Sequence, residues 1–335
     1  MSAPQRAGIP VFDLESLKAF SADDMQRVNR VIEQRLQSDV VLINQLSQHI
    51  IHSGGKRLRP MLVMICCRAC GYQGDNDALL AAIIEFIHTA TLLHDDVVDD
   101  SEMRRGQQTA STIWGNEAAV LVGDYLYSRA FQMMVDVNSL DIMNLMANTT
   151  NTIAQGEVMQ LLNINEPDIS EAHYHEVIYS KTACLFEAAC QVAGIVTAGS
   201  DDDTVKSLGD YGRHLGIAFQ LVDDALDYTA DADALGKNIG DDLAEGKPTL
   251  PLIYAMQHGN EGERSLIRQA IEQGGLEHID AVTATIERTG ALAYTREQAV
   301  NHAELAKSKL NSLKSDPDAI AALRFLADYA VERST

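Results

Sequence analysis

Proline is scarce in this chain. Seven prolines occur in 335 residues, and none lies between Pro60 and Pro167 or between Pro167 and Pro248. Proline ends helices, so long proline-free stretches rich in Ala, Leu, Met, Glu and Gln favour helix. Alternating β-branched runs are few and Asn-Gly turns are lacking, which argues against a β-sheet protein. We therefore expect an all-α fold. Because no Ser/Gly-rich linker interrupts the chain, we expect a single domain over 1–335, with a flexible N-terminus at 1–10.

Positive charge is also in short supply. The chain carries 26 Lys and Arg against 48 Asp and Glu, a formal net charge of −22. This excess argues against binding to nucleic acid and against electrostatic adhesion to anionic membranes. The first ten residues lack the apolar region of a signal peptide. The most apolar stretch, 78–93, contains Glu85 and His88, so we predict a buried helix there and no integral membrane segment.

Cysteine is too sparse for a disulfide scaffold in a chain of this length. Cys66, Cys67 and Cys70 lie in an apolar helical run without a second Cys/His pair nearby. Buried reduced thiols are therefore favoured over a zinc site. Thiols of this kind point to a reducing, cytoplasmic location.

Familiar cofactor loops are missing as well. The acidic segment 231–242 matches an EF-hand only in part, because Leu235 occupies a ligand position. Gly246-Lys247 is followed by Pro248 where a P-loop requires Ser or Thr. Nucleophile elbows, zincin motifs and GxGxxG patterns are not found in the sequence. The chemistry must therefore come from other residues.

Helical periodicity covers most of the chain. Apolar spacing and turn residues predict one or two helices in 12–52 and further helices at 61–71, 78–102, 116–135, 140–163, 171–199, 203–229, 249–258, 262–273, 278–289, 291–313 and 317–332.

Two aspartate clusters of matching design stand out from this helical background. Residues 95–99 read Asp-Asp-Val-Val-Asp and residues 223–227 read Asp-Asp-Ala-Leu-Asp. In each cluster the first and last carboxylates share one helix face and repel each other. A solvated helix end is the ordinary alternative, but the apolar residues before Asp95 imply a buried helix. Mg²⁺, held by carboxylates and substrate phosphates, fits such clusters best.

The placement of the few cations supports a phosphorylated ligand. His88 and Gln220 precede the two clusters at helical spacing and share their faces. Arginine and lysine recognise phosphate as a planar fork and a compact charge, respectively. Eight cations lie beside glycines or helix ends: Lys56, Arg57, Arg59, Arg104, Arg105, Lys181, Lys237 and Lys247.

These motifs resemble those of the trans-isoprenyl diphosphate synthase family. The sequence 93–106, Leu-His-Asp-Asp-Val-Val-Asp followed by Met103-Arg104-Arg105-Gly106, is similar to that family's first aspartate-rich motif. Residues 54–60 resemble its N-terminal substrate motif, 219–227 its second aspartate-rich motif, and 179–183 its Lys-Thr pair. The resemblance spans about 30–330 and, within the family, is greatest for bacterial octaprenyl diphosphate synthases. It implies a helical bundle of the isoprenoid synthase type around a central cavity.

The resemblance also implies a role for each motif residue. Two or three Mg²⁺ ions would be held by Asp95, Asp96, Asp99, Asp223, Asp224 and Asp227. The allylic diphosphate would be bound by Arg104, Lys181, Thr182, Gln220, Lys237 and Lys247. Isopentenyl diphosphate would be bound by Lys56, Arg57, Arg59, His88 and Arg105. The residues expected to carry catalysis are Asp95, Asp96, Asp99, Arg104, Lys181, Asp223, Asp224 and Lys237.

The product chain also needs space. Ala90 and Thr91 precede Asp95 by about one helical turn, and the resemblance implies that bulky residues there stop elongation early. Small side chains therefore favour a long all-trans product, such as the octaprenyl chain used for quinone side chains. Candidates for the tunnel floor are Met133, Met134, Met143 and Met146.

Other functions remain as alternatives. A terpene cyclase normally replaces the second cluster by an Asn/Asp, Ser/Thr, Glu triplet, and it has no use for the 54–60 motif. A non-catalytic subunit of a prenyl synthase usually loses the aspartates. A short-chain synthase differs only in product length. The resemblance also implies a homodimer, although no periodicity identifies the interface.

Overall fold

A computed structural model gives the structure of the chain. It describes residues 12–52, 55–104, 106–197, 202–229, 239–313 and 315–333. The predicted flexible N-terminus and two predicted site residues, Arg105 and Lys237, lie outside these ranges.

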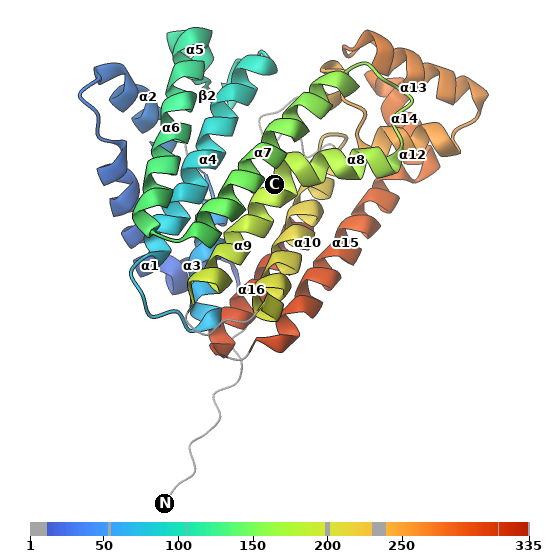
Figure 1. The fold of residues 1–335 in the computed structure, drawn as a ribbon. Helices are drawn as coiled ribbons and strands as arrows, with labels where there is room; N and C mark the ends of the chain where they lie inside the picture. Colours follow the sequence, from blue (N-terminus) through green and yellow to red (C-terminus); the bar gives the residue numbers. More distant parts are fainter. Residues whose placement is uncertain are drawn as a thin grey trace, which may run out of the picture.

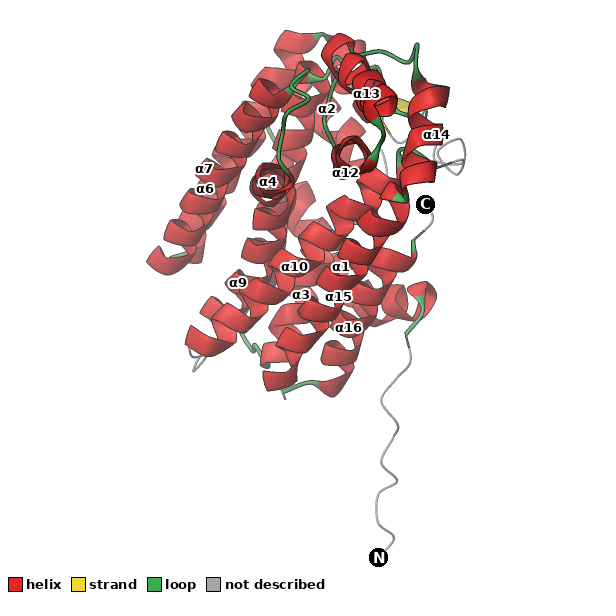
Figure 2. Ribbon diagram, turned by 90° about the vertical axis from the view of Figure 1, so that its right-hand side faces the viewer, coloured by secondary structure: helices red, strands yellow, loops and turns green. Residues whose placement is uncertain are grey.

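The predicted all-α class is confirmed. Long helices run side by side through the body of the molecule, and α12 to α14 form a group at one end (Figure 1). Figure 2 shows the described chain as almost entirely helical. The helices are α1 Leu14–Leu36, α2 Val41–His52, α3 Leu58–Cys70, α4 Asp77–Val98, α5 Ala110–Trp114, α6 Asn116–Val137, α7 Leu140–Asn163, α8 Glu171–Ile178, α9 Cys184–Val196, α10 Asp202–Leu226, α11 Asp241–Ala244, α12 Leu250–His258, α13 Glu261–Gln273, α14 Ile279–Thr289, α15 Ala291–Lys309 and α16 Pro317–Glu332.

Helix α4 is the apolar helix that the sequence predicted to be buried. It is long and apolar enough to cross a membrane, but 72% of its apolar 18-residue segment is buried inside the protein. Its first turn is fixed by Asp77, which accepts a hydrogen bond of 2.9 Å from Arg27 of α1. Its other end carries the first aspartate cluster. The burial of α4 thus holds that cluster on a rigid element.

Helix α10 carries the second cluster and packs between α9 and α15. The close approach to the segment before α9 depends on Gly216, where a Cβ atom would lie 2.6 Å from the Cα of Ala183. Such a distance is not tolerated by a side chain, so glycine permits backbone contact here. The part of α10 around Gly216 is therefore fixed against the segment that carries Lys181.

The sequence prediction was wrong about the continuity of 171–199. Helix α8 is followed by a π-helical turn, η1 (Tyr179–Ala183), before α9 begins. A π turn inserts an extra residue into a helix and occurs often at functional sites. It cannot be read from apolar spacing, because the helix continues on both sides.

Short elements were also missed around the clusters. Helix α4 ends at Val98, four positions before its predicted end, and Asp100 adopts a left-handed conformation with φ of 51°. A small antiparallel hairpin follows, formed by β1 (Met103–Arg104) and β2 (Gln107–Gln108). At the C-terminal end of α15, the 3₁₀ turn η3 (Leu310–Ser312) replaces the last predicted helical residues.

The cysteines are free thiols, as predicted. Four of the five, Cys66, Cys67, Cys184 and Cys190, are buried, and Cys70 is half-buried. Burial raises the pKa of the Cys70 thiol to about 12, which keeps it protonated.

Candidate active site

The first aspartate cluster lies where α4 ends. Asp95 and Asp99 are partly exposed, whereas Asp96 is buried. The Nε of Arg104, from the hairpin strand β1, donates to Asp96 Oδ1 at 2.6 Å. Burial raises the pKa of Asp96, and Arg104 opposes this shift. Arg104 is therefore fixed beside the cluster by its middle carboxylate.

The second cluster also combines a partly exposed carboxylate with buried ones. Asp223 is 43% exposed, but Asp224 is buried and both of its oxygens accept hydrogen bonds. Gln220 Nε2 donates to Oδ1 at 2.8 Å, and Tyr174 Oη donates to Oδ2 at 2.5 Å. Burial, followed by the nearby charge of Asp242, raises the pKa of Asp224 to about 8.

The last carboxylate of this cluster, Asp227, is also buried. Its Oδ2 accepts a hydrogen bond of 3.2 Å from the backbone N–H of Asp242 at α11. Of the six aspartates, three are thus buried and held by protein groups. The other three, which we call the outward carboxylates, are partly exposed: Asp95, Asp99 and Asp223.

The π turn η1 connects the two clusters. Lys181 Nζ lies 3.6 Å from Asp95 Oδ1 of the first cluster. The next residue, Thr182, donates from Oγ1 to Gln220 Oε1 at 2.9 Å, and Gln220 in turn contacts Asp224 of the second. Adjacent residues of one turn therefore reach both clusters, so the clusters face a common space.

Two lysines converge on the first cluster. Lys247, which follows α11, places Nζ 3.1 Å from Asp99 Oδ1 and also pairs with Glu245. Burial lowers the pKa of Lys181, but the carboxylates of Asp95 and Glu157 outweigh burial and leave it above its ordinary value. The same balance, with Asp99 and Glu245 as partners, raises the pKa of Lys247. Both ammonium groups stay charged beside the cluster.

The predicted isopentenyl diphosphate residues are partly brought together. Arg59 Nη1 lies 3.1 Å from His88 Nε2, and its guanidinium stacks 4.3 Å from the centre of the Phe186 ring. Arginine only donates, so Nε2 of His88 is the acceptor. Lys56 Nζ lies 5.3 Å from the Tyr329 ring, and Arg57 caps α3 in a left-handed conformation with φ of 45°. Arg59 and His88 thus lie together as one pair of the predicted isopentenyl diphosphate residues.

The donor set suits Mg²⁺ rather than a preformed protein cage. Among the described residues, no three His, Cys, Asp or Glu side chains are grouped closely enough to hold a metal ion. The outward carboxylates instead pair with Lys181, Lys247 and Arg333. Mg²⁺ usually takes one or two carboxylates together with substrate phosphates and water. A diphosphate that drew these cations to itself would leave hard oxygen ligands for the metal, so the residues fit the ion.

Comparison with known proteins agrees with this geometry. The polyprenyl synthetase family model matches residues 40–288. The octaprenyl diphosphate synthase of Escherichia coli (strain K12) is 53% identical over 322 residues, which cover 96% of this chain and 99% of that protein. The corresponding protein of Haemophilus influenzae is 50% identical over 325 residues, covering 97% and 98%. The chain belongs to the polyprenyl synthetase family.

A solved structure of this family has the same fold. The polyprenyl synthase of Caulobacter crescentus, complexed with calcium and isoprenyl diphosphate, aligns with a TM-score of 0.91 at 43% identity. The alignment covers 97% of this chain and 99% of that one. The family resemblance predicted from the motifs is therefore confirmed.

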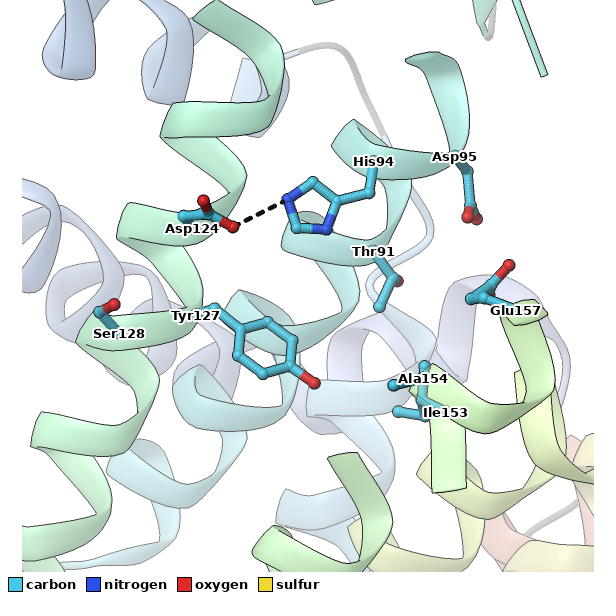
Figure 3. A pocket seen from close by; sticks show the side chains of 9 residues that line it. All are labelled: Thr91, His94, Asp95, Asp124, Tyr127, Ser128, Ile153, Ala154 and Glu157. Atoms are coloured by element: carbon cyan, nitrogen blue, oxygen red, sulfur yellow. Dashed lines mark ion pairs between the residues drawn. The ribbon is translucent and has the colours of Figure 1, made fainter. Parts of the chain in front are cut away.

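In this polyprenyl synthetase, a pocket opens directly beneath the first cluster. It has a volume of about 520 Å³ and lies between α4, α6 and α7 (Figure 3). The Tyr127 ring extends from α6 across the pocket. The lining residues are Thr91, His94, Asp95, Asp124, Tyr127, Ser128, Ile153, Ala154 and Glu157.

The two predicted chain-length residues, although adjacent in sequence, have different environments. Thr91 lines the pocket, whereas Ala90 is fully buried in the core and is not part of the lining. Met133, Met134 and Met146 are likewise buried in the core, and Met143 packs partly against it. Tyr127 is the large side chain that the sequence did not single out.

Three further residues at the site were missed. Glu157 Oε2 accepts from Lys181 at 2.8 Å, and Tyr174 holds Asp224. Arg333, close to the C-terminus, pairs with Asp223 at 2.8 Å and stacks 3.6 Å from the Phe219 ring. The run Gly156-Glu157-Val158 contributes to the family resemblance but implied no role for Glu157. Tyr174 and Arg333 lie outside the motifs, so no signal in the sequence pointed to them.

Proposed function

We propose that the protein condenses an allylic diphosphate with successive isopentenyl diphosphates to a long all-trans polyprenyl diphosphate. Octaprenyl (C40), of the kind used for quinone side chains, is the proposed product. The observation that carries the proposal is the π turn η1, whose Lys181 and Thr182 reach both aspartate clusters. Two carboxylate-bearing helix ends, with Arg104, Lys181 and Lys247 beside the first of them, suit a single diphosphate.

The proposed reaction begins with loss of diphosphate from the allylic substrate. Lys181, Lys247 and Arg104 contact the aspartates of the first cluster. They would bind the diphosphate oxygens and stabilise the charge that develops as the carbon–oxygen bond breaks. Bound Mg²⁺ would supply further Lewis-acid stabilisation of that leaving group. Lys237 would belong to the same set.

The second substrate would lie against the Arg59–His88 pair. Arg59 and His88, with Lys56, Arg57 and Arg105, would hold isopentenyl diphosphate so that its double bond faces the allylic cation. Bond formation and transfer of a proton to the departed diphosphate then give a chain five carbons longer. No covalent bond to the protein is required.

We propose that the three outward carboxylates, Asp95, Asp99 and Asp223, would hold two or three Mg²⁺ ions. Asp96, Asp224 and Asp227 are buried and already accept hydrogen bonds from protein groups. They would orient Arg104, Gln220 and the backbone at α11 around the metal ligands. This division narrows the predicted set of six metal ligands to three.

We also propose a cytoplasmic homodimer that packs through α6 and α7. Exposed apolar residues gather on these helices, and the described exposed residues of α7 from Asn144 onwards carry no charge. Two copies of a chain with a net charge of −22 associate most easily across an uncharged face. The large apolar residues exposed on α6 and α7 are Val120, Leu121, Val135, Leu140, Val158, Leu161 and Leu162.

The test is incubation of the purified chain with farnesyl diphosphate, isopentenyl diphosphate and Mg²⁺, followed by chromatography of the products. A C40 product supports the proposal, and a product that stops at C20 supports a short-chain synthase instead. Absence of any elongation with active substrates and metal would overturn the assignment.

A further inference from the structure

Glu157 of α7 is an acidic residue at the edge of the pocket that no predicted role covers. Its side chain is 30% exposed, and its Oε2 accepts a hydrogen bond of 2.8 Å from Lys181. The same ammonium lies 3.6 Å from Asp95. Figure 3 shows Glu157 and Asp95 side by side at one rim of the pocket. Lys181 is thus shared between a proposed metal ligand and a carboxylate that is not one.

The backbone around this contact is built for close approach. Gly156 precedes Glu157, and a Cβ atom there would lie 2.8 Å from the backbone N of Lys181 and 2.8 Å from the Cβ of Ser180. Any side chain at 156 would therefore force α7 away from η1. Lys181 itself lies in the π turn η1, which inserts an extra residue into the helix on the other side of this contact. Both backbones are arranged so that Glu157 reaches Lys181.

A carboxylate beside a diphosphate site has an electrostatic cost. It is partly buried, which disfavours its charged form, and it repels an anionic substrate. Packing alone does not account for it, since an apolar side chain would fill this edge of the pocket without those penalties. The contact with Lys181 is the interaction that offsets them.

We propose that Glu157 is a positioning residue that holds the Lys181 ammonium over the allylic diphosphate. The inference rests on the proposed function. Lysine is a flexible four-carbon stem with a point charge. With Asp95 engaged as a metal ligand, Glu157 would remain as the acceptor that keeps Lys181 in place. What is needed is a hydrogen-bond acceptor at this point, so glutamine can replace glutamate.

The test is a double-mutant cycle. Glu157→Leu and Glu157→Gln are made in the wild-type chain and in Lys181→Met, and kcat, both KM values and the midpoint of thermal unfolding (Tm) are measured. Glu157→Leu should raise KM for the allylic diphosphate about tenfold, since a hydrogen bond to a charged group is lost. KM for isopentenyl diphosphate and Tm should stay near wild type. Glu157→Gln should restore the allylic KM to within about threefold.

In the Lys181→Met background, Glu157→Leu should add less than a twofold change, because its partner is gone. Glu304→Leu is the matched control, since Glu304 pairs with Lys307 at 2.6 Å on α15, away from the pocket; it should leave both KM values unchanged. Equal effects of Glu157→Leu with and without Lys181, a Gln variant as poor as Leu, or an unchanged allylic KM would each overturn the inference. An inactive wild-type chain would overturn the proposed function itself.

Discussion

The Nζ of Lys247 lies 3.1 Å from Oδ1 of Asp99, although the two residues are 148 positions apart in the chain. Lys247 follows the second aspartate cluster, and Asp99 ends the first. Their contact holds the segment that contains Lys247 against the end of α4. The first cluster is therefore completed by a lysine that lies far from it in the sequence and follows the second cluster.

Removal of an outward carboxylate should abolish most of the activity. Asp95→Ala and Asp223→Ala should each lower kcat by about a hundredfold or more, because the leaving diphosphate loses its metal. Both side chains are partly exposed, so circular dichroism and Tm should stay near wild type. Asp328→Ala, at a surface pair with Lys307, is the control. Near-normal turnover of both variants at saturating Mg²⁺ would contradict the metal assignment.

Tyr174→Phe tests the support of Asp224. The variant removes the hydrogen bond of 2.5 Å to Asp224 Oδ2 and leaves a buried carboxyl with fewer donors, at a cost of about 1–3 kcal/mol in unfolding free energy. Because Asp224 orients Gln220, kcat should fall as well. Tyr211→Phe is the matched control, because it removes a comparable buried hydrogen bond: the fully buried Tyr211 donates to the Leu323 carbonyl at 2.8 Å. It should lower stability and leave kcat per folded molecule unchanged. Equal kcat in the two variants would exclude the orienting role.

Product length should respond to Thr91 more cleanly than to Ala90. Thr91→Phe fills the pocket from its wall and should shorten the product, as measured by chromatography, while Thr91→Ser should not. Ala90 has no exposed surface, so Ala90→Phe overpacks the core at a cost of about 1–3 kcal/mol and should lower Tm. A C40 product from Thr91→Phe would remove this wall from the elongation path.

Three half-buried histidines make stability depend on pH. His302 of α15 lies against His214 of α10, with their Nδ1 atoms 3.0 Å apart, and stacks on His175 of α8. Burial, followed by His214 and His175, lowers the pKa of His302 from 6.5 to about 4.

The unfolded chain therefore binds a proton at this residue between about pH 6.5 and pH 4, where the folded chain does not. Stability should fall as pH decreases through that window. Tm measured from pH 7 to pH 4.5 should fall less steeply in His302→Gln than in wild type. His258→Gln, at an exposed position, should keep the wild-type slope. Parallel curves for all three proteins would exclude a contribution from His302.

Charge on the outer face of α7 should disrupt the proposed dimer. Asn151→Glu places a carboxylate on the exposed, uncharged side of α7, where two copies would bring like charges together. Analytical ultracentrifugation should then show a shift to monomer. Asn301→Glu, an exposed asparagine in the middle of α15, makes the same change elsewhere and should leave the mass unaltered. An unchanged dimer in Asn151→Glu would place the interface on another face.

The sequence by itself determined the helices and the kind of chemistry. Apolar spacing predicted α7 and α16 with their observed bounds, because helix periodicity and caps are local properties of the chain. The two aspartate clusters predicted paired carboxylates on helix faces for the same reason. The family followed from four ordered motifs, each of which is a short continuous segment.

Tertiary structure alone decided which carboxylates are exposed and which side chains they contact. The spacing of Asp95, Asp96 and Asp99 does not reveal that Asp96 turns inward to Arg104, because burial depends on what packs against α4. Neither does it reveal Glu157, Tyr174 or Arg333, which come from α7, α8 and the end of the chain. Contacts between distant segments depend on how helices pack in space, and glycines and a π turn set that packing here. The residues that position the chemistry are for this reason visible only in the folded molecule.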